Sequence, residues 1–149
     1  MPPDKLNDVL NKAIEKKDFS LCSSSDLDKT DERRCYYNYA IEISDSRACA
    51  KIDFFGDDIS DSNGGCYIQV AEKTSSAVLC EQIKENSGGT KKQIKNLCYY
   101  KLGIVKKDKS LCEKMTDNYE YYCPPCPVGA MCTACPSTAT KENCIEKAN

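Results

Sequence analysis

Four cysteines near the C-terminus have the spacing of a metal site. Cys123, Cys126, Cys132 and Cys135 form two Cys-x-x-Cys pairs. Four thiolates can bind zinc tetrahedrally or hold an iron–sulfur cluster. The two pairs are closer together than in a usual zinc ribbon, and prolines lie in and beside them, which favours disulfides. A four-cysteine zinc or iron–sulfur site is the alternative prediction.

The first of these pairs, Cys123-Pro124-Pro125-Cys126, also has the form of a thiol–disulfide oxidoreductase motif. In such enzymes a helix N-terminus lowers the pKa of the attacking thiol, whereas here the prolines continue at Pro127. Oxidoreductase activity is therefore a second, weaker alternative. The chain contains no histidine, so neither a Ser-His-Asp nor a Cys-His nucleophile can form. We predict that the protein is not an enzyme and has no cofactor.

Twelve cysteines in 149 residues are the strongest feature of the composition. Such a number is typical of disulfide-linked proteins of oxidising compartments. A net charge of −2, with lysines scattered among acids, excludes the basic surface that binds nucleic acid. No stretch approaches the ~20 consecutive apolar residues of a membrane span. The first residues carry no secretory signal, so we expect that a leader absent from this chain directs export.

A pattern of paired cysteines recurs along the chain. In three places a cysteine followed by tyrosine precedes a second cysteine by fourteen residues: Cys35 and Cys49, Cys66 and Cys80, Cys98 and Cys112. A small residue stands five places after the first cysteine in each copy: Ala40, Ala71, Gly103. Self-similarity at about thirty residues is typical of stacked helical repeats.

The first segment of the chain belongs to the same pattern. Its apolar residues recur at helical spacing: Leu6, Val9, Leu10, Ala13, Ile14. Ala13 precedes Cys22 by nine residues, as Ala40 precedes Cys49, but Asp8 stands where the other copies have cysteine. A bridge inside each copy would therefore leave Cys22 without a partner.

Bridges across the following turn leave no cysteine of the array unpaired. We predict the pairs Cys22–Cys35, Cys49–Cys66, Cys80–Cys98 and Cys112–Cys123, with Cys126, Cys132, Cys135 and Cys144 as a closed set. Long helices are expected at about 30–44, 65–74 and 90–106, and a last short helix at 141–148. Short helices should begin at residues whose side chains cap the first free amides: Asp18, Asp45, Ser76, Asp108.

The motifs Leu79-Cys80-Glu81-Gln82-Ile83 and Leu111-Cys112-Glu113-Lys114-Met115, alternating with Cys-Tyr, carry a family resemblance. Over about residues 5 to 123 the chain resembles uncharacterised, exported, archaeal-type proteins with cysteine-bearing helical repeats. The resemblance implies export and a helical-repeat fold, and it implies no activity.

Together these patterns predict an all-α stack of disulfide-stapled helical hairpins at 1–122 and an irregular, cysteine- and proline-rich cap at 123–149. Repeat stacks present extended surfaces that suit binding. We predict a non-enzymatic extracellular or cell-surface module, structural or adhesive. It would bind a protein or a surface polymer, or self-associate into an array, with no role for nucleic acid or a membrane span.

Overall fold

Long helices and short helical turns follow one another along the chain. The computed structural model describes residues 4–53, 62–83, 94–115, 119–120, 138–139 and 141–149. Its helices are α1 (Lys5–Lys16), η1 (Phe19–Cys22), α2 (Lys29–Ile43), η2 (Ser46–Lys51), α3 (Asn63–Thr74), η3 (Ala77–Gln82), α4 (Ile94–Lys106), α5 (Lys109–Glu113) and α6 (Lys141–Lys147), where η is a 3₁₀ helix. Strands β1 (Tyr119–Glu120) and β2 (Thr138–Ala139) form one short antiparallel pair. The predicted all-α class is confirmed.

The expected helix boundaries are close to the observed ones. Helix α2 begins and ends one residue before the prediction, and α3 begins two residues earlier than predicted. Helix α6 ends at Lys147, one residue before the predicted end. Residues 90–93, which we expected at the start of α4, lie outside the described residues.

Each of the first four long helices ends in the same way. Lys17, Ser44, Ser75 and Lys107 adopt left-handed backbone angles, with φ between 53° and 59°. The residue that follows donates its backbone N–H to the carbonyl of the small residue of the pattern, as Asp45 does to Ala40 at 3.0 Å. This arrangement satisfies a carbonyl that the helix end would otherwise leave unpaired.

Three of the four short turns begin at a capping aspartate. Asp18, Asp45 and Asp108 each accept a hydrogen bond from the backbone N–H two residues on, at 3.0, 3.1 and 2.9 Å. The expectation that Ser76 caps the third turn is wrong, because its side chain makes no capping hydrogen bond.

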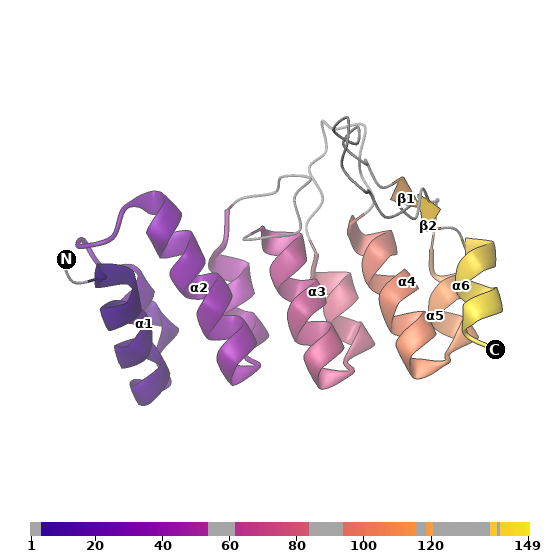
Figure 1. The fold of residues 1–149 in the computed structure, drawn as a ribbon, viewed down its shortest axis with the longest axis horizontal. Helices are drawn as coiled ribbons and strands as arrows, with labels where there is room; N and C mark the ends of the chain where they lie inside the picture. The colour runs from indigo at the N-terminus through magenta and orange to yellow at the C-terminus, as the bar shows by residue number, and fades with distance from the viewer. Residues whose placement is uncertain (1–3, 54–61, 84–93, 116–118, 121–137, 140) are drawn as a thin grey trace, which may run out of the picture.

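The long helices lie side by side in a row, with the short turns on one side of the row (Figure 1). Contacts join α1 to α2, α2 to α3, α3 to α4 and α4 to α6, and each turn packs on the long helix before it. The core includes the residues one, four and five places after each helical cysteine: Tyr36, Tyr39, Ala40, Tyr67, Val70, Ala71, Tyr99, Leu102, Gly103. The residue three places after a turn cysteine is also buried at Ile52, Ile83 and Met115.

Three of the predicted disulfides are confirmed. The pairs Cys22–Cys35, Cys49–Cys66 and Cys80–Cys98 have S–S distances of 2.11, 2.04 and 2.08 Å. Each joins a short turn to the long helix that follows it, and these cysteines are at most 1% exposed. The pairing across the turn therefore ties each turn to two consecutive long helices.

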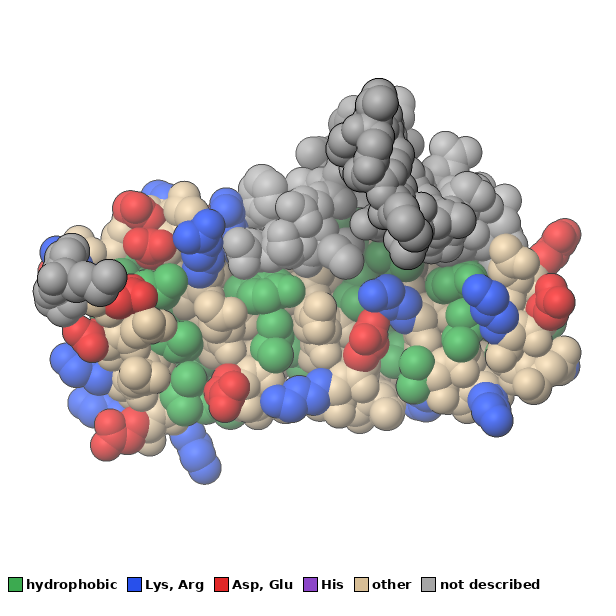
Figure 2. All heavy atoms as spheres, viewed as in Figure 1, with side chains coloured by type: hydrophobic (Ala, Val, Ile, Leu, Met, Phe, Trp, Pro, Cys, Tyr) green, Lys and Arg blue, Asp and Glu red, His purple; other side chains and the backbone are tan. Residues whose placement is uncertain are grey.

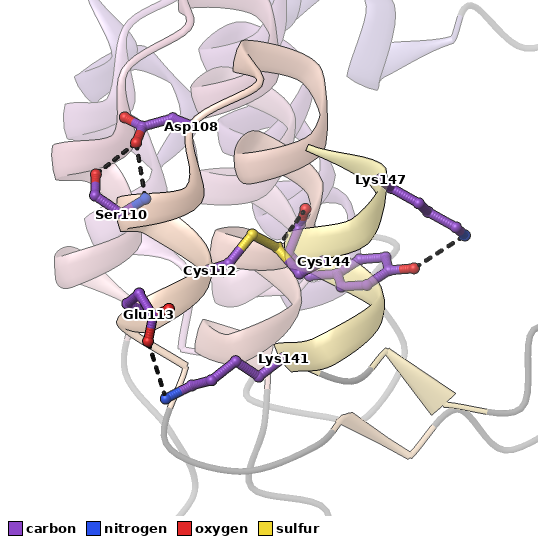
Figure 3. Close-up of a disulfide and its surroundings, with 8 residues drawn as sticks. Asp108, Ser110, Cys112, Glu113, Lys141, Cys144 and Lys147 are labelled. Carbon is purple, nitrogen blue, oxygen red and sulfur yellow. Dashed lines mark hydrogen bonds and ion pairs between the residues drawn. A yellow bond between two sulfur atoms is a disulfide. The ribbon is translucent and has the colours of Figure 1, made fainter. Parts of the chain in front are cut away.

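The predicted pair Cys112–Cys123 is wrong. Cys112 bonds to Cys144, with an S–S distance of 2.04 Å and a sequence separation of 32 (Figure 3). The predicted closed set of four is consequently wrong as well, since Cys144 is taken. The other cysteines of the tail, Cys123, Cys126, Cys132 and Cys135, lie outside the described residues.

The physical reason for the changed pairing is the position of α6. This helix packs against α4 and α5, so it presents Cys144 to the turn as the earlier long helices present their cysteines. Lys147 Nζ donates to the Tyr100 hydroxyl at 3.2 Å, and Lys141 Nζ lies 3.9 Å from Glu113 (Figure 3). Helix α6 thus completes the row where a further long helix would otherwise follow.

Candidate functional site: a charged hollow beside Tyr36

The tyrosine that follows each helical cysteine occupies a matching place in α2, α3 and α4. Tyr36, Tyr67 and Tyr99 are buried, with 6%, 6% and 3% of their surface exposed. The preceding cysteine of each is held by a disulfide to the turn before its helix. The disulfide next to each tyrosine therefore holds its ring in place, and residues of the flanking turns surround the ring.

A hollow of about 230 Å³ lies beside Tyr36. Its lining comes from the first two turns of α2 and from the end of η2: Lys29, Glu32, Arg33, Tyr36, Lys51, Asp53. The lining carries three cations and two carboxylates. Lys51 and Asp53 follow Cys49 by two and four residues, so the disulfide to α3 anchors the segment that carries them.

Two carboxylates of the lining act on the Tyr36 hydroxyl. Burial raises the pKa of the Tyr36 hydroxyl, a hydrogen bond with Ser23 opposes this rise, and the charges of Glu32 and Asp53 add to it. The two side-chain charges with the largest effect on this hydroxyl are thus carboxylates. A positively charged group placed beside Tyr36 would be stabilised.

The charges on the rim of the hollow are only partly neutralised. Lys29 Nζ lies 3.5 Å from Glu32, but the lysine side chain is 96% exposed, so this ion pair contributes little. Within the described residues neither Lys51 nor Asp53 forms an ion pair, although both are exposed and line the same hollow. An exposed cation and an exposed carboxylate are therefore held near one another and remain accessible.

The surroundings of Tyr99 are closed by charged side chains. The Tyr99 hydroxyl donates a hydrogen bond to Glu81 of η3. Lys114 Nζ lies 5.9 Å from the centre of the Tyr99 ring and 4.0 Å from Glu81 Oε1. Burial, followed by the hydrogen bond and the charge of Glu81, raises the pKa of Tyr99 well above its ordinary value.

Tyr67 neither lines the charged hollow nor has, within the described residues, a carboxylate and a lysine beside it as Tyr99 does. The residues at the positions of Glu81 and Lys114 are Ala50 and Gln82, which carry no charge. The pKa of Tyr67 is raised by burial alone. Among the three tyrosines, only Tyr36 lines the charged hollow described above.

The predicted cysteine sites contribute no reactive thiol to the described part of the chain. Cys22, Cys35, Cys49, Cys66, Cys80, Cys98, Cys112 and Cys144 all form disulfides. In the same residues no three histidine, cysteine or acidic side chains gather into a group that could hold a metal ion. The alternative metal site of four tail cysteines and the Cys123-Pro124-Pro125-Cys126 motif stay predictions.

Sequence reasoning missed the hollow. Lys51 and Asp53 resemble ordinary surface charges in sequence, and the tyrosines predicted only helix packing. The available signal was positional: Lys51 and Lys114 each stand two residues after a turn cysteine. Only the packing of η2 on α2 brings Lys51 to Tyr36.

Comparisons of the chain with models of protein families, with curated proteins and with solved structures found no match. No described helix combines the length and the apolar character that crossing a membrane requires. The chemistry of the hollow and the pattern of disulfides are therefore the grounds for assigning a function.

Proposed function

We propose that the protein is a non-enzymatic extracellular module that binds a protein or a polymer at the cell surface. Four disulfides support an oxidising compartment, because intracellular thiols are generally kept reduced. The resemblance to exported, archaeal-type helical-repeat proteins points the same way. On this proposal the row of helices is a short repeat stack with a cysteine-rich cap.

The observation that carries the binding role is the hollow beside Tyr36, where opposite charges stay accessible on a cross-linked scaffold. A site that is ordered before binding loses less entropy when a partner arrives. Lysines also tie neighbouring helices: Lys73 Nζ donates to the Ile41 carbonyl at 2.6 Å and Lys106 Nζ to the Ser75 carbonyl at 3.0 Å. Such ties keep the surface preorganised.

Binding through the faces of the row is better supported than growth of an array from its ends. The exposed residues of α1 are polar or charged: Lys5, Asn7, Asp8, Asn11, Lys12, Glu15, Lys16. Glu142, Glu146 and Lys147 are exposed on α6. Polar outer faces are typical of helices that terminate a repeat stack. Charges of both signs are interspersed over the face in Figure 2, which suits a partner of mixed charge.

The compartment is tested by mass spectrometry of the intact, unreduced protein. With twelve cysteines, full oxidation into six disulfides lowers the mass by twelve hydrogens relative to the reduced chain. This is the expected result. Four disulfides with four free thiols and a bound metal ion would instead support the metalloprotein alternative.

The binding role is tested with the labelled, oxidised full chain on intact cells and on purified cell envelope of the organism that produces it. We expect saturable binding that unlabelled protein displaces and that reduction with alkylation abolishes. Binding that does not saturate, or that the reduced protein retains, would contradict the proposal.

A further inference from the structure

We propose that the hollow beside Tyr36 binds a segment of a protein partner that carries a basic and an acidic side chain close together. The basic group would lie between Glu32 and the exposed Asp53, beside Tyr36, and the acidic group at Lys51. This inference rests on the binding role proposed above and specifies the chemistry of the partner.

The geometry of the lining sets this polarity. Tyr36 is buried and the Glu32 side chain is only 22% exposed, whereas Lys51 is exposed at the rim. The carboxylates of Glu32 and Asp53 are the main charges acting on the Tyr36 hydroxyl. A guanidinium or ammonium group beside Glu32 and Asp53 therefore meets negative charge, which stabilises a cation.

The rim favours the opposite sign. Lys51 has no ion pair among the described residues, and Lys29 is held only by its exposed pair with Glu32. A basic group arriving at Glu32 would release Lys29, which could then join Lys51 in holding a carboxylate. A ligand with one charge alone would meet repulsion at one end of the hollow.

The size of the hollow favours side chains of a protein over a free ligand. At about 230 Å³ it is smaller than the ~300–1,000 Å³ of ordinary small-molecule pockets. Anchors at protein interfaces commonly fill small pockets of this kind, and arginine is prominent among them.

The test uses the oxidised full chain and three capped helical peptides, which carry Lys and Glu four residues apart, two Lys, or two Glu. NMR titration should give the strongest binding for the mixed peptide. Asp53→Asn and Lys51→Gln should each weaken it about fivefold, the size of one exposed charge contact. Asp8→Asn and Lys12→Gln on the exposed side of α1 are the matched controls and should leave binding unchanged.

A variant that binds a different peptide most strongly has altered recognition, whereas a misfolded variant binds all three peptides less. Lys51→Glu should make the two-Lys peptide the strongest ligand, which a merely destabilised protein would not do. Equal or stronger binding of the two-Glu peptide by the unaltered chain would overturn the proposal, as would binding that the Asp53 and Lys51 variants retain or binding of none of the three. Binding of glycine in place of the mixed peptide would overturn the protein source and indicate a free zwitterion.

The two proposals fail separately. Should the Asp53 and Lys51 variants bind the cell envelope as the unaltered chain does, the hollow is not the contact site and the binding role stands. Should the unaltered chain itself not bind the envelope, the broader role fails, whatever the peptides do.

Discussion

The surroundings of Tyr36 on α2 and of Tyr99 on α4 have a lysine in common and differ in the residue that the preceding turn supplies. Each tyrosine has a lysine nearby that stands two residues after the cysteine of the following turn, Lys51 or Lys114. Beside Tyr99 the preceding turn supplies Glu81, which accepts from the hydroxyl and lies 4.0 Å from the lysine. Beside Tyr36 the matching residue is Ser23, directly after Cys22.

The same scaffold thus holds one tyrosine whose nearby lysine is paired with a carboxylate, which we call the closed position, and one whose nearby lysine is not, the open position. A carboxylate at the position of Glu81 neutralises the lysine and takes the tyrosine hydroxyl, so little charge remains for a partner. A serine there leaves the lysine without an ion pair among the described residues. The residue after the turn cysteine is one difference, and the α2 positions of Glu32 and Arg33 hold Lys95 and Asn96 in α4.

The largest expected loss of stability comes from removing a disulfide next to α2 or next to α4. Replacing both Cys22 and Cys35 with alanine should lower the free energy of unfolding by about 3 kcal/mol, and replacing Cys112 and Cys144 by nearer ~4 kcal/mol, because the sequence separations are 13 and 32. Denaturant unfolding measures both. The second change should also abolish hydrogen-exchange protection in α6, since a helix of seven residues is unstable alone. Protection that persists would show that packing without the bridge holds α6.

The next effect comes from the close approach of α6 to α4. A Cβ at Gly103 would lie 2.8 Å from Cys112 Sγ and 2.9 Å from Cys144 Sγ, and these sulfurs are fixed at both ends. Gly103→Ala should therefore cost about 1–3 kcal/mol in denaturant unfolding, despite the better helix propensity of alanine. A gain of about 1 kcal/mol, as in an exposed helix, would contradict this contact.

Ala71→Gly is the matched reverse change, because Ala71 stands at the position of Gly103 in α3. It removes a buried methyl group, and it should cost about 1 kcal/mol. Two losses from opposite substitutions would show that the last position excludes a Cβ that the earlier position accommodates.

The hydroxyl groups provide a direct measure of the closed and open positions. Tyr99→Phe should cost about 1 kcal/mol, Tyr36→Phe about half of that, and Tyr67→Phe nearly nothing, because their partners are a carboxylate, a serine and none among the described residues. Thermal or denaturant unfolding gives the order. A larger loss of unfolding free energy for Tyr67→Phe than for Tyr99→Phe would contradict the stabilising role of the hydrogen bond to Glu81.

The pH dependence of stability gives a second readout of Tyr99. Its pKa is higher in the folded chain than the ordinary value of 10.0, so folding favours the protonated hydroxyl. The resulting stability is fully present below the ordinary pKa and is lost as the pH rises toward the folded pKa. Above that ordinary value the unaltered chain should lose stability more steeply than Tyr99→Phe does.

Local periodicity was sufficient for much of the fold and insufficient for the site. The constant interval from Cys35 to Cys49 and its copies identified the repeat, and Asp8 in place of a leading cysteine then predicted the pairing of the turns with Cys35, Cys66 and Cys98. Cys144 lies 32 residues beyond Cys112 and is not followed by tyrosine, so no local pattern could mark α6 as the element that completes the row. The hollow needs side chains from α2 and η2 at once, which spacing along the chain does not reveal.

A smaller effect on the unfolding free energy distinguishes the turn after α2 from the turn before α4. Asp45→Ala removes the cap of the turn after α2, where the carboxylate accepts from Arg47 N at 3.1 Å, and it should cost about 1 kcal/mol. Ser76→Ala should cost much less, because the turn before α4 has no side-chain cap. The pKa of Asp45 is lowered mainly by its hydrogen bond with the Arg47 side chain. Its contribution should therefore disappear as the pH falls through that lowered value, and an equal cost for both variants would contradict the capping geometry.

The smallest expected change in stability comes from giving Tyr36 the carboxylate neighbour that Tyr99 has. Ser23→Glu places a carboxylate where η3 has Glu81, so it should pair with Lys51 and accept from the Tyr36 hydroxyl. The unfolding free energy should change by only a few tenths of a kcal/mol, about the value of an exposed ion pair. Binding of the mixed-charge peptide should be lost, and a spectroscopic titration should give a higher pKa for Tyr36, because the new charge disfavours the phenolate.

Ser23→Gln is the control for this change, because it adds similar bulk without the charge. If the glutamine variant also abolishes peptide binding, filling of space closes the hollow and the charge of Glu81 is not what distinguishes the two tyrosines. If only the glutamate variant does so, neutralisation of Lys51 is the cause. The charge of the residue after the turn cysteine then decides whether the hollow beside Tyr36 accepts a partner.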